Sequence, residues 1–164
     1  MSATAEIGRT AQAAQLERIG RVGYALGAAL VVAGGLVAAV TSPLALAKGS
    51  WLAAYLVLVC GVAQCMLASQ RPTGTSMDAA TGRLRLMLVG WNAGNALVIV
   101  GVLTAIPIVV DVGGVVLLAV LVTSLVETRH AAASARIVLL RVALVLLIAS
   151  IPIGLVLAHA RAAS

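Results

Sequence analysis

The sequence has no phenylalanine and little charge. Among its 164 residues, aromatic residues make up 2% and charged residues 10%, whereas apolar residues make up 62%. A soluble domain carries about 25% charged residues, which give its surface groups that water can solvate. The shortage of charge therefore excludes an ordinary soluble domain and indicates that lipid surrounds much of the chain.

Residue patterns that carry catalysis or metal binding are missing as well. The sequence contains no P-loop, no HExxH, no GxSxG and no acidic metal cluster. Cys60 and Cys65 form no CxxC motif, and on one helix they would point about 140° apart, which excludes a disulfide between them. We therefore expect no enzymatic activity, no cofactor and no metal ion.

The sequence does contain long apolar stretches, each near the roughly 20 residues that cross a bilayer as a helix. Five of them lie at residues 22–41, 51–69, 85–105, 107–126 and 137–158. Backbone amides find no water in lipid, and the alternation of a membrane barrel is missing, so these stretches are predicted to be helices. The predicted fold class is an all-α, polytopic integral membrane protein with a bundle of five transmembrane helices. The main alternative joins the third and fourth stretches as a re-entrant pair.

Basic residues fall mainly in alternate gaps between these stretches. Nine of them precede the first stretch or lie in or beside the second and fourth gaps: Arg9, Arg18, Arg21, Arg71, Arg83, Arg85, Arg129, Arg136 and Arg141. Only Lys48 and Arg161 belong to the opposite set of gaps. Because cytoplasmic loops carry an excess of Lys and Arg, the N-terminus is predicted to be cytoplasmic and the C-terminus outside. His130 and His159 then lie on opposite sides of the membrane and cannot share one haem or metal ion.

The same charge pattern separates two kinds of partner. A net charge of +6 would suit nucleic acid, but these arginines bracket membrane stretches instead of forming one soluble surface. We therefore exclude nucleic acid and expect contact with the lipid bilayer, including anionic headgroups. The bias toward alanine, valine, leucine and glycine favours a bacterial origin, so the predicted location is the inner (cytoplasmic) membrane, as a multi-pass protein.

Residues 1–21 form a predicted cytoplasmic segment ahead of the transmembrane domain, residues 22–164. The segment is compatible with a helix, but its apolar side chains do not align into one broad stripe. A helix resting on the lipid headgroups and a frayed polar lead-in both remain open.

Polar side chains inside the predicted helices mark candidate sites, because they are costly in lipid. Judged by depth, five of them gather in the cytoplasmic half or near the middle: Gln64, Asn92, Asn95, Arg141 and Glu127. They would serve as polar glue between helices, worth about 0.6–2 kcal/mol per amide pair, or line a path for a substrate or ion. Asp111 would be a proton or cation relay, or an anchor at the outer interface near a helix N-terminus.

Glycines predict where helices approach closely. Three of them fall within roughly 40° of one another on the third stretch: Gly90, Gly94 and Gly101. The two asparagines of that stretch lie on the opposite side, so the third helix should be the centre of the bundle. Gly23 and Gly27 form a second small-residue pattern, which would contact that glycine face or join two copies.

The four aromatic residues are predicted to form belts at the two membrane interfaces, with Trp51 and Tyr55 outside and Tyr24 and Trp91 inside. The predicted function is that of a small non-enzymatic accessory or structural subunit, which acts through helix packing with other membrane subunits or by self-association. The first alternative is a small transporter or channel component with a polar path near the Gln64 group. The second is a membrane enzyme acting on lipid.

Overall fold

The computed structural model describes the backbone of residues 3–70, 76–128 and 135–162, and the side chains of residues 6–70, 76–128 and 137–152. These parts of the chain form helices joined by turns and contain no strand, which confirms the all-α part of the predicted fold class. The elements are α1 (Ala3–Thr41), α2 (Gly49–Tyr55), η1 (Leu56–Ala63), α3 (Gln64–Ala68), α4 (Met77–Thr104), α5 (Pro107–Thr128) and α6 (Ala135–Ala162). Because α2, the π-helix η1 and α3 follow one another without a break, we call them together the second helix.

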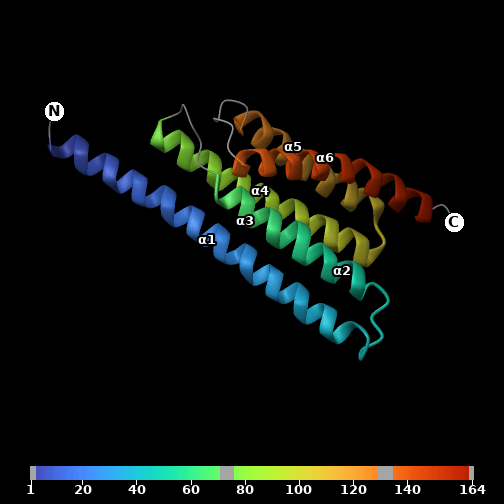
Figure 1. Cartoon of the computed structure of the whole chain (residues 1–164). Coiled ribbons are helices and arrows are strands. Elements are labelled where there is room, and N and C mark those ends of the chain that lie inside the picture. The colour runs from blue at the N-terminus through green and yellow to red at the C-terminus, as the bar shows by residue number, and fades with distance from the viewer. Residues whose placement is uncertain (1–2, 71–75, 129–134, 163–164) are drawn as a thin grey trace.

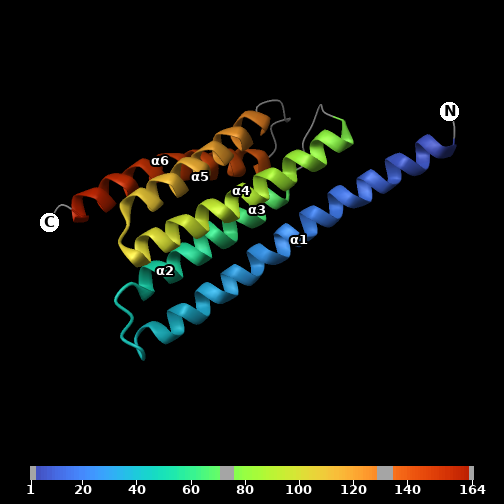
Figure 2. The same cartoon turned by 180° about the vertical axis from the view of Figure 1, so that it is seen from behind.

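The helices pack side by side, and each runs opposite to the one before it (Figures 1 and 2). The order across the bundle is α1, the second helix, α4, α5 and α6, with α4 packed against α1, the second helix and α5. Helix α6 packs against α5 at the other side of the bundle. The third apolar stretch of the sequence therefore does occupy an inner position.

Four of the described helices are long and apolar enough to cross a membrane: Glu6–Thr41, Gly49–Ala68, Met77–Thr104 and Pro107–Thr128. In α6, the part with described side chains, Ile137–Pro152, is apolar but shorter. The protein is thus compatible with a transmembrane bundle by the length and composition of its helices.

Helix α1 continues without interruption through the predicted boundary between residues 21 and 22. Its 39 residues span about 58 Å at 1.5 Å per residue, whereas the hydrocarbon core of a bilayer is about 30 Å thick. The N-terminal half is held along the start of α4, where Gln12 Nε2 donates a hydrogen bond of 3.0 Å to Asp78 Oδ2. Leu16 and Ile19 pack against the buried core on the same side. The N-terminal segment is therefore one rod with the first span.

Glycines set the distance between α1 and the second helix. A Cβ atom at Gly27 would lie 2.9 Å from the Gly61 carbonyl oxygen, and one at Gly34 would lie 2.9 Å from the Ala53 carbonyl oxygen. A Cβ at Gly23 would lie 2.7 Å from Leu88 Cδ1 of α4. Hence Gly23 and Gly27 serve packing within the chain, against the second helix and Leu88 rather than against the glycine face of α4.

The turn between α4 and α5 is as short as the sequence implies, and Pro107 begins α5. Ala105 adopts a left-handed conformation with φ of 57°, and Ile106 N–H donates to the Gly101 carbonyl, which closes the end of α4. Lys48, from the loop after α1, donates to the Val102 carbonyl in the last turn of α4. A lysine is well placed there, because the last carbonyls of a helix lack partners and carry negative partial charge.

Candidate functional site

The π-helical segment of the second helix separates two polar residues, the half-buried Tyr55 and the buried Gln64. Tyr55 precedes η1, and its hydroxyl donates a 2.8 Å hydrogen bond to Asn95 Oδ1 of α4. Asn95 is buried, and its Nδ2 donates to the Trp91 carbonyl of its own helix at 2.8 Å. The Asn95 side-chain oxygen thus accepts a hydrogen bond from the second helix, and its nitrogen donates one within α4. The first of these bonds joins α4 to the second helix.

Gln64 follows the π-helical segment and is 1% exposed. Its Nε2 donates to the Gly23 carbonyl of α1 at 3.3 Å, which the missing side chain of Gly23 makes accessible. Its Oε1 and the Nε1 of Trp91, also 1% exposed, have no hydrogen-bond partner among the described residues. The core of the bundle thus holds one buried acceptor and one buried donor that the described protein groups leave unpaired.

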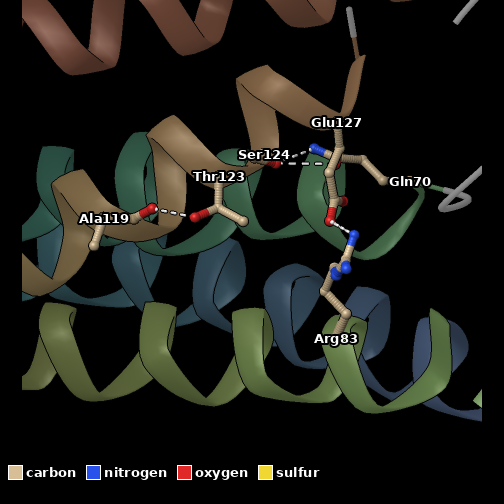
Figure 3. Close-up of polar contacts among 6 residues, drawn as sticks. All are labelled: Gln70, Arg83, Ala119, Thr123, Ser124 and Glu127. Carbon is tan, nitrogen blue, oxygen red and sulfur yellow. Dashed lines mark hydrogen bonds and ion pairs between the residues drawn. The ribbon is translucent and has the colours of Figure 1, made fainter. Parts of the chain in front are cut away.

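A second group of polar residues joins three helices at the end of the bundle where α4 begins. We call Gln70, Arg83, Ser124 and Glu127 the end cluster; Figure 3 shows the side chains reaching toward one another from the segment after α3, from α4 and from α5. Ser124 is fully buried and exchanges hydrogen bonds of 2.6 and 2.9 Å with the Gln70 amide. Arg83 Nη1 lies 3.0 Å from Glu127 Oε1, with the carboxylate side chain 15% exposed. The end cluster links the second helix and α4 to the last turns of α5.

Four polar residues were predicted to gather in the cytoplasmic half of the bundle, and each of them bonds to a different partner: Gln64, Asn92, Arg141 and Glu127. Asn92 Nδ2 donates to the Leu88 carbonyl, one turn earlier on α4. Arg141 of α6 donates to the Thr128 carbonyl at the end of α5, and Glu127 pairs with Arg83. These side chains therefore bond to separate partners at several points of the bundle.

The glycine face of α4 lies against α5. A Cβ at Gly94 would meet Leu117 Cδ2 at 2.8 Å, one at Gly101 would meet the Val110 nitrogen at 2.7 Å, and one at Gly90 would meet Val120 Cγ2 at 3.1 Å. From the other side, a Cβ at Gly113 would lie 2.8 Å from the Gly94 carbonyl oxygen. The backbones of α4 and α5 are thus in direct contact.

The structure also shows where the remaining acidic, aromatic and cysteine residues singled out in the sequence lie. Asp111 is half-buried on α5, one turn after Pro107. Trp91 is buried in the core, so its assignment to an interfacial belt was wrong; Trp51 and Tyr55 stack with ring centroids 5.2 Å apart. Cys60 and Cys65 are both free thiols. His130 and the side chain of His159 lie outside the described residues.

Sequence reasoning did not find Gln70, Tyr55 and Lys48 as bonding partners. Gln70 falls after the end of the predicted second span, and the position of Tyr55 predicts a membrane-interface residue. The Tyr55–Asn95 bond joins positions 40 residues apart in the sequence, and no local spacing marks such a pair. Because an unpaired amide is costly in lipid, the sequence predicts that Asn95 has a hydrogen-bond partner, but it does not identify Tyr55 as that partner.

The chemistry that these residues offer is hydrogen bonding and one ion pair. Among the residues with described side chains, no group of three or more His, Cys, Asp or Glu residues is arranged to hold a metal ion. The chain matches no protein-family model, and no similar curated protein or solved structure was found. What the protein does is therefore inferred from the geometry of this chain alone.

Proposed function

We propose that this protein is a five-span, non-enzymatic subunit of a bacterial cytoplasmic membrane, with its N-terminus inside and its C-terminus outside. Its polar residues would hold the helices in register, and its remaining apolar faces would contact lipid, a partner subunit or another copy. The function is then to provide a rigid helical scaffold within the membrane.

The observation that carries this proposal is the Tyr55–Asn95 hydrogen bond. An intramembrane polar residue in a substrate path needs atoms that are free to meet the substrate. Asn95 instead has its oxygen bonded to Tyr55 and its nitrogen bonded to Trp91, and Asn92 bonds to its own helix. These contacts favour polar glue over a path.

A specific observation favours a small transporter or channel component as the second candidate. Gln64 Oε1 and Trp91 Nε1 are buried without a described partner, and a π-helical segment lies directly before Gln64. Such segments occur frequently at functional sites, and unpaired buried polar atoms are costly unless a ligand or water meets them. In this case, the interface of the second helix and α4 would open to water.

Thiol accessibility separates the two candidates. Cys60 is buried on the second helix between Tyr55 and Gln64, and Cys65 can be removed as Cys65→Ala. For a packed scaffold in liposomes, we expect a membrane-impermeant maleimide to leave Cys60 unmodified until the protein is denatured. Ala47→Cys, an exposed position in the loop after α1, in a chain lacking both native cysteines, is the control that must react. Modification of native Cys60 at a comparable rate would overturn the scaffold and favour the water-filled path.

The proposed orientation has a separate test. Arg83 and Arg85 at the start of α4 lie at the same end of the bundle as the end of α5 and the start of α6 (Figure 1). With that end in the cytoplasm and α6 as a fifth span, a phosphatase fused to the C-terminus is expected to be active outside the cell. Fluorescence of a C-terminal reporter that matures only in the cytoplasm would contradict the five-span topology.

A further inference from the structure

A groove of about 520 Å³ lies between the end of α1 and the beginning of the second helix. Small or apolar residues of α1 and the second helix line most of it, and three residues with hydroxyl side chains line one end: Thr41, Ser42 and Ser50. The volume falls within the roughly 300–1,000 Å³ of small-molecule sites. The groove therefore has the size of a binding site, although it lies away from the polar residues of the bundle.

Glycine and alanine create this groove. Gly34 brings α1 to within contact of Val57 and the Ala53 carbonyl, so the two backbones form its floor. A Cβ at Gly35 would meet nothing within 4 Å, and Ala38 and Ala54 are exposed from the two opposing helices. Longer side chains at these positions would fill the space.

One end of the groove is lined by polar side chains and the other end by apolar side chains. The hydroxyls of Thr41, Ser42 and Ser50 lie where α1 ends and the second helix begins, which is the level of a membrane interface for helices that span it. The opposite end, at Gly34, Val57 and Leu58, is apolar. From Gly34 to Thr41 the groove extends about 10 Å along α1, which is less than the roughly 15 Å of hydrocarbon in one leaflet.

The loop that leads to the polar end carries Lys48, whose ammonium bonds to the Val102 carbonyl in the last turn of α4 and is not part of the groove lining. Gly49 packs closely against Thr41, since a Cβ there would collide with Thr41 Oγ1, and the preceding residue is Lys48. The Thr41 hydroxyl donates to the Val37 carbonyl of its own helix at 2.7 Å. The polar end thus offers the exposed hydroxyls of Ser42 and Ser50, which can donate hydrogen bonds to the oxygens of a lipid headgroup.

We propose that this groove holds an acyl chain of a phospholipid from the leaflet on the Thr41 side, with the lipid headgroup at the hydroxyls of Ser42 and Ser50. The polarity of the lining matches an amphiphile whose polar part lies at the interface and whose tail points toward the bilayer centre. Small residues also suit the close approach of a transmembrane helix from a second copy, and the test below separates this occupant from a lipid by the oligomeric state.

Native mass spectrometry of the full-length protein, purified from membranes in mild detergent, tests this proposal. We expect the wild-type protein to carry a retained phospholipid, seen as a mass increase of a single lipid per chain. Ala38→Leu and Ala54→Leu place a larger side chain in the groove from its two walls, and each should lose the lipid-bound species. Ala39→Leu makes the same change on the adjacent exposed residue of α1, outside the lining, and should keep it.

Equal lipid retention in Ala38→Leu, Ala54→Leu and Ala39→Leu would overturn the proposal, as would a wild-type protein that retains no lipid. A wild-type dimer that both groove variants convert to monomers would assign the groove to a second copy instead. Circular dichroism at rising temperature checks that each variant remains folded, which is expected because all three positions are exposed helical alanines.

Discussion

Alanine in place of Trp91 is expected to lower the free energy of unfolding by about 3–5 kcal/mol, the range for truncating a large buried aromatic side chain. Trp91 is the largest of the fully buried residues and lies in the core cluster with Leu67, Leu117 and Leu121. In lipid, packing replaces the hydrophobic effect as the force between helices, so nothing compensates for the van der Waals attraction that the cavity removes. Unfolding of the purified protein in mixed micelles, titrated with a denaturing detergent, measures the loss.

Two further variants isolate the cause of that loss. Trp91→Phe keeps most of the ring and removes the Nε1–H, which has no described partner, so its cost should be well below that of Trp91→Ala. Leu86→Ala truncates a side chain that is 72% exposed on the same helix and should change stability little. Equal effects of Trp91→Ala and Leu86→Ala would show that Trp91 is not in the core.

Gly113→Ala is expected to destabilise the protein by about 1–3 kcal/mol, the usual cost of overpacking. The added Cβ would lie 2.8 Å from the Gly94 carbonyl oxygen and 2.9 Å from the Val98 nitrogen. Both are backbone atoms, so the whole of α4 must move away from α5 to relieve the contact. The same detergent titration measures this change.

Gly82→Ala on α4 is the matched control for Gly113→Ala. A Cβ at Gly82 would meet nothing within 4 Å, and alanine is favoured over glycine inside a helix by about 1 kcal/mol. The two glycine-to-alanine changes should therefore have opposite signs. Destabilisation of similar size in both variants would contradict the assignment of the Gly113→Ala effect to the contact between α4 and α5, because helix propensity alone favours alanine at both positions.

The sequence predicts the positions of the apolar helices along the chain better than it predicts which helices are neighbours. Hydropathy and turn residues locate the apolar part of each helix, and Pro107 starts α5 as expected. Helices α1 and α4 nevertheless begin well before the predicted stretches, because their first turns are polar. Helical spacing also identifies a shared face, which is why Gly90, Gly94 and Gly101 all lie toward α5. Neither signal says which neighbouring helix the face meets.

The candidate site was harder to predict than the helices, because depth does not determine direction around a helix axis. Asn92 and Gln64 are predicted from the sequence to lie at similar depths, yet Asn92 bonds to the Leu88 carbonyl of its own helix and Gln64 to Gly23 of α1. The π-helical segment Leu56–Ala63 adds to this difficulty, since it changes the angular step assumed for every residue that follows. The sequence position of Trp91 alone predicts an interface, and only the packing of α4 shows that this side chain is buried.

The length of α1 gives the molecule a mechanical property. Close glycine contacts with the second helix leave α1 little freedom to slide or rotate, while the rod is nearly twice as long as the hydrocarbon core is thick. A sideways force on its first turns would therefore act as a torque on the joined pair, with the membrane as the pivot. If α1 crosses a membrane, the part outside the hydrocarbon core stays joined to α4 by the Gln12–Asp78 hydrogen bond, so tilting α1 would tilt the start of α4 with it.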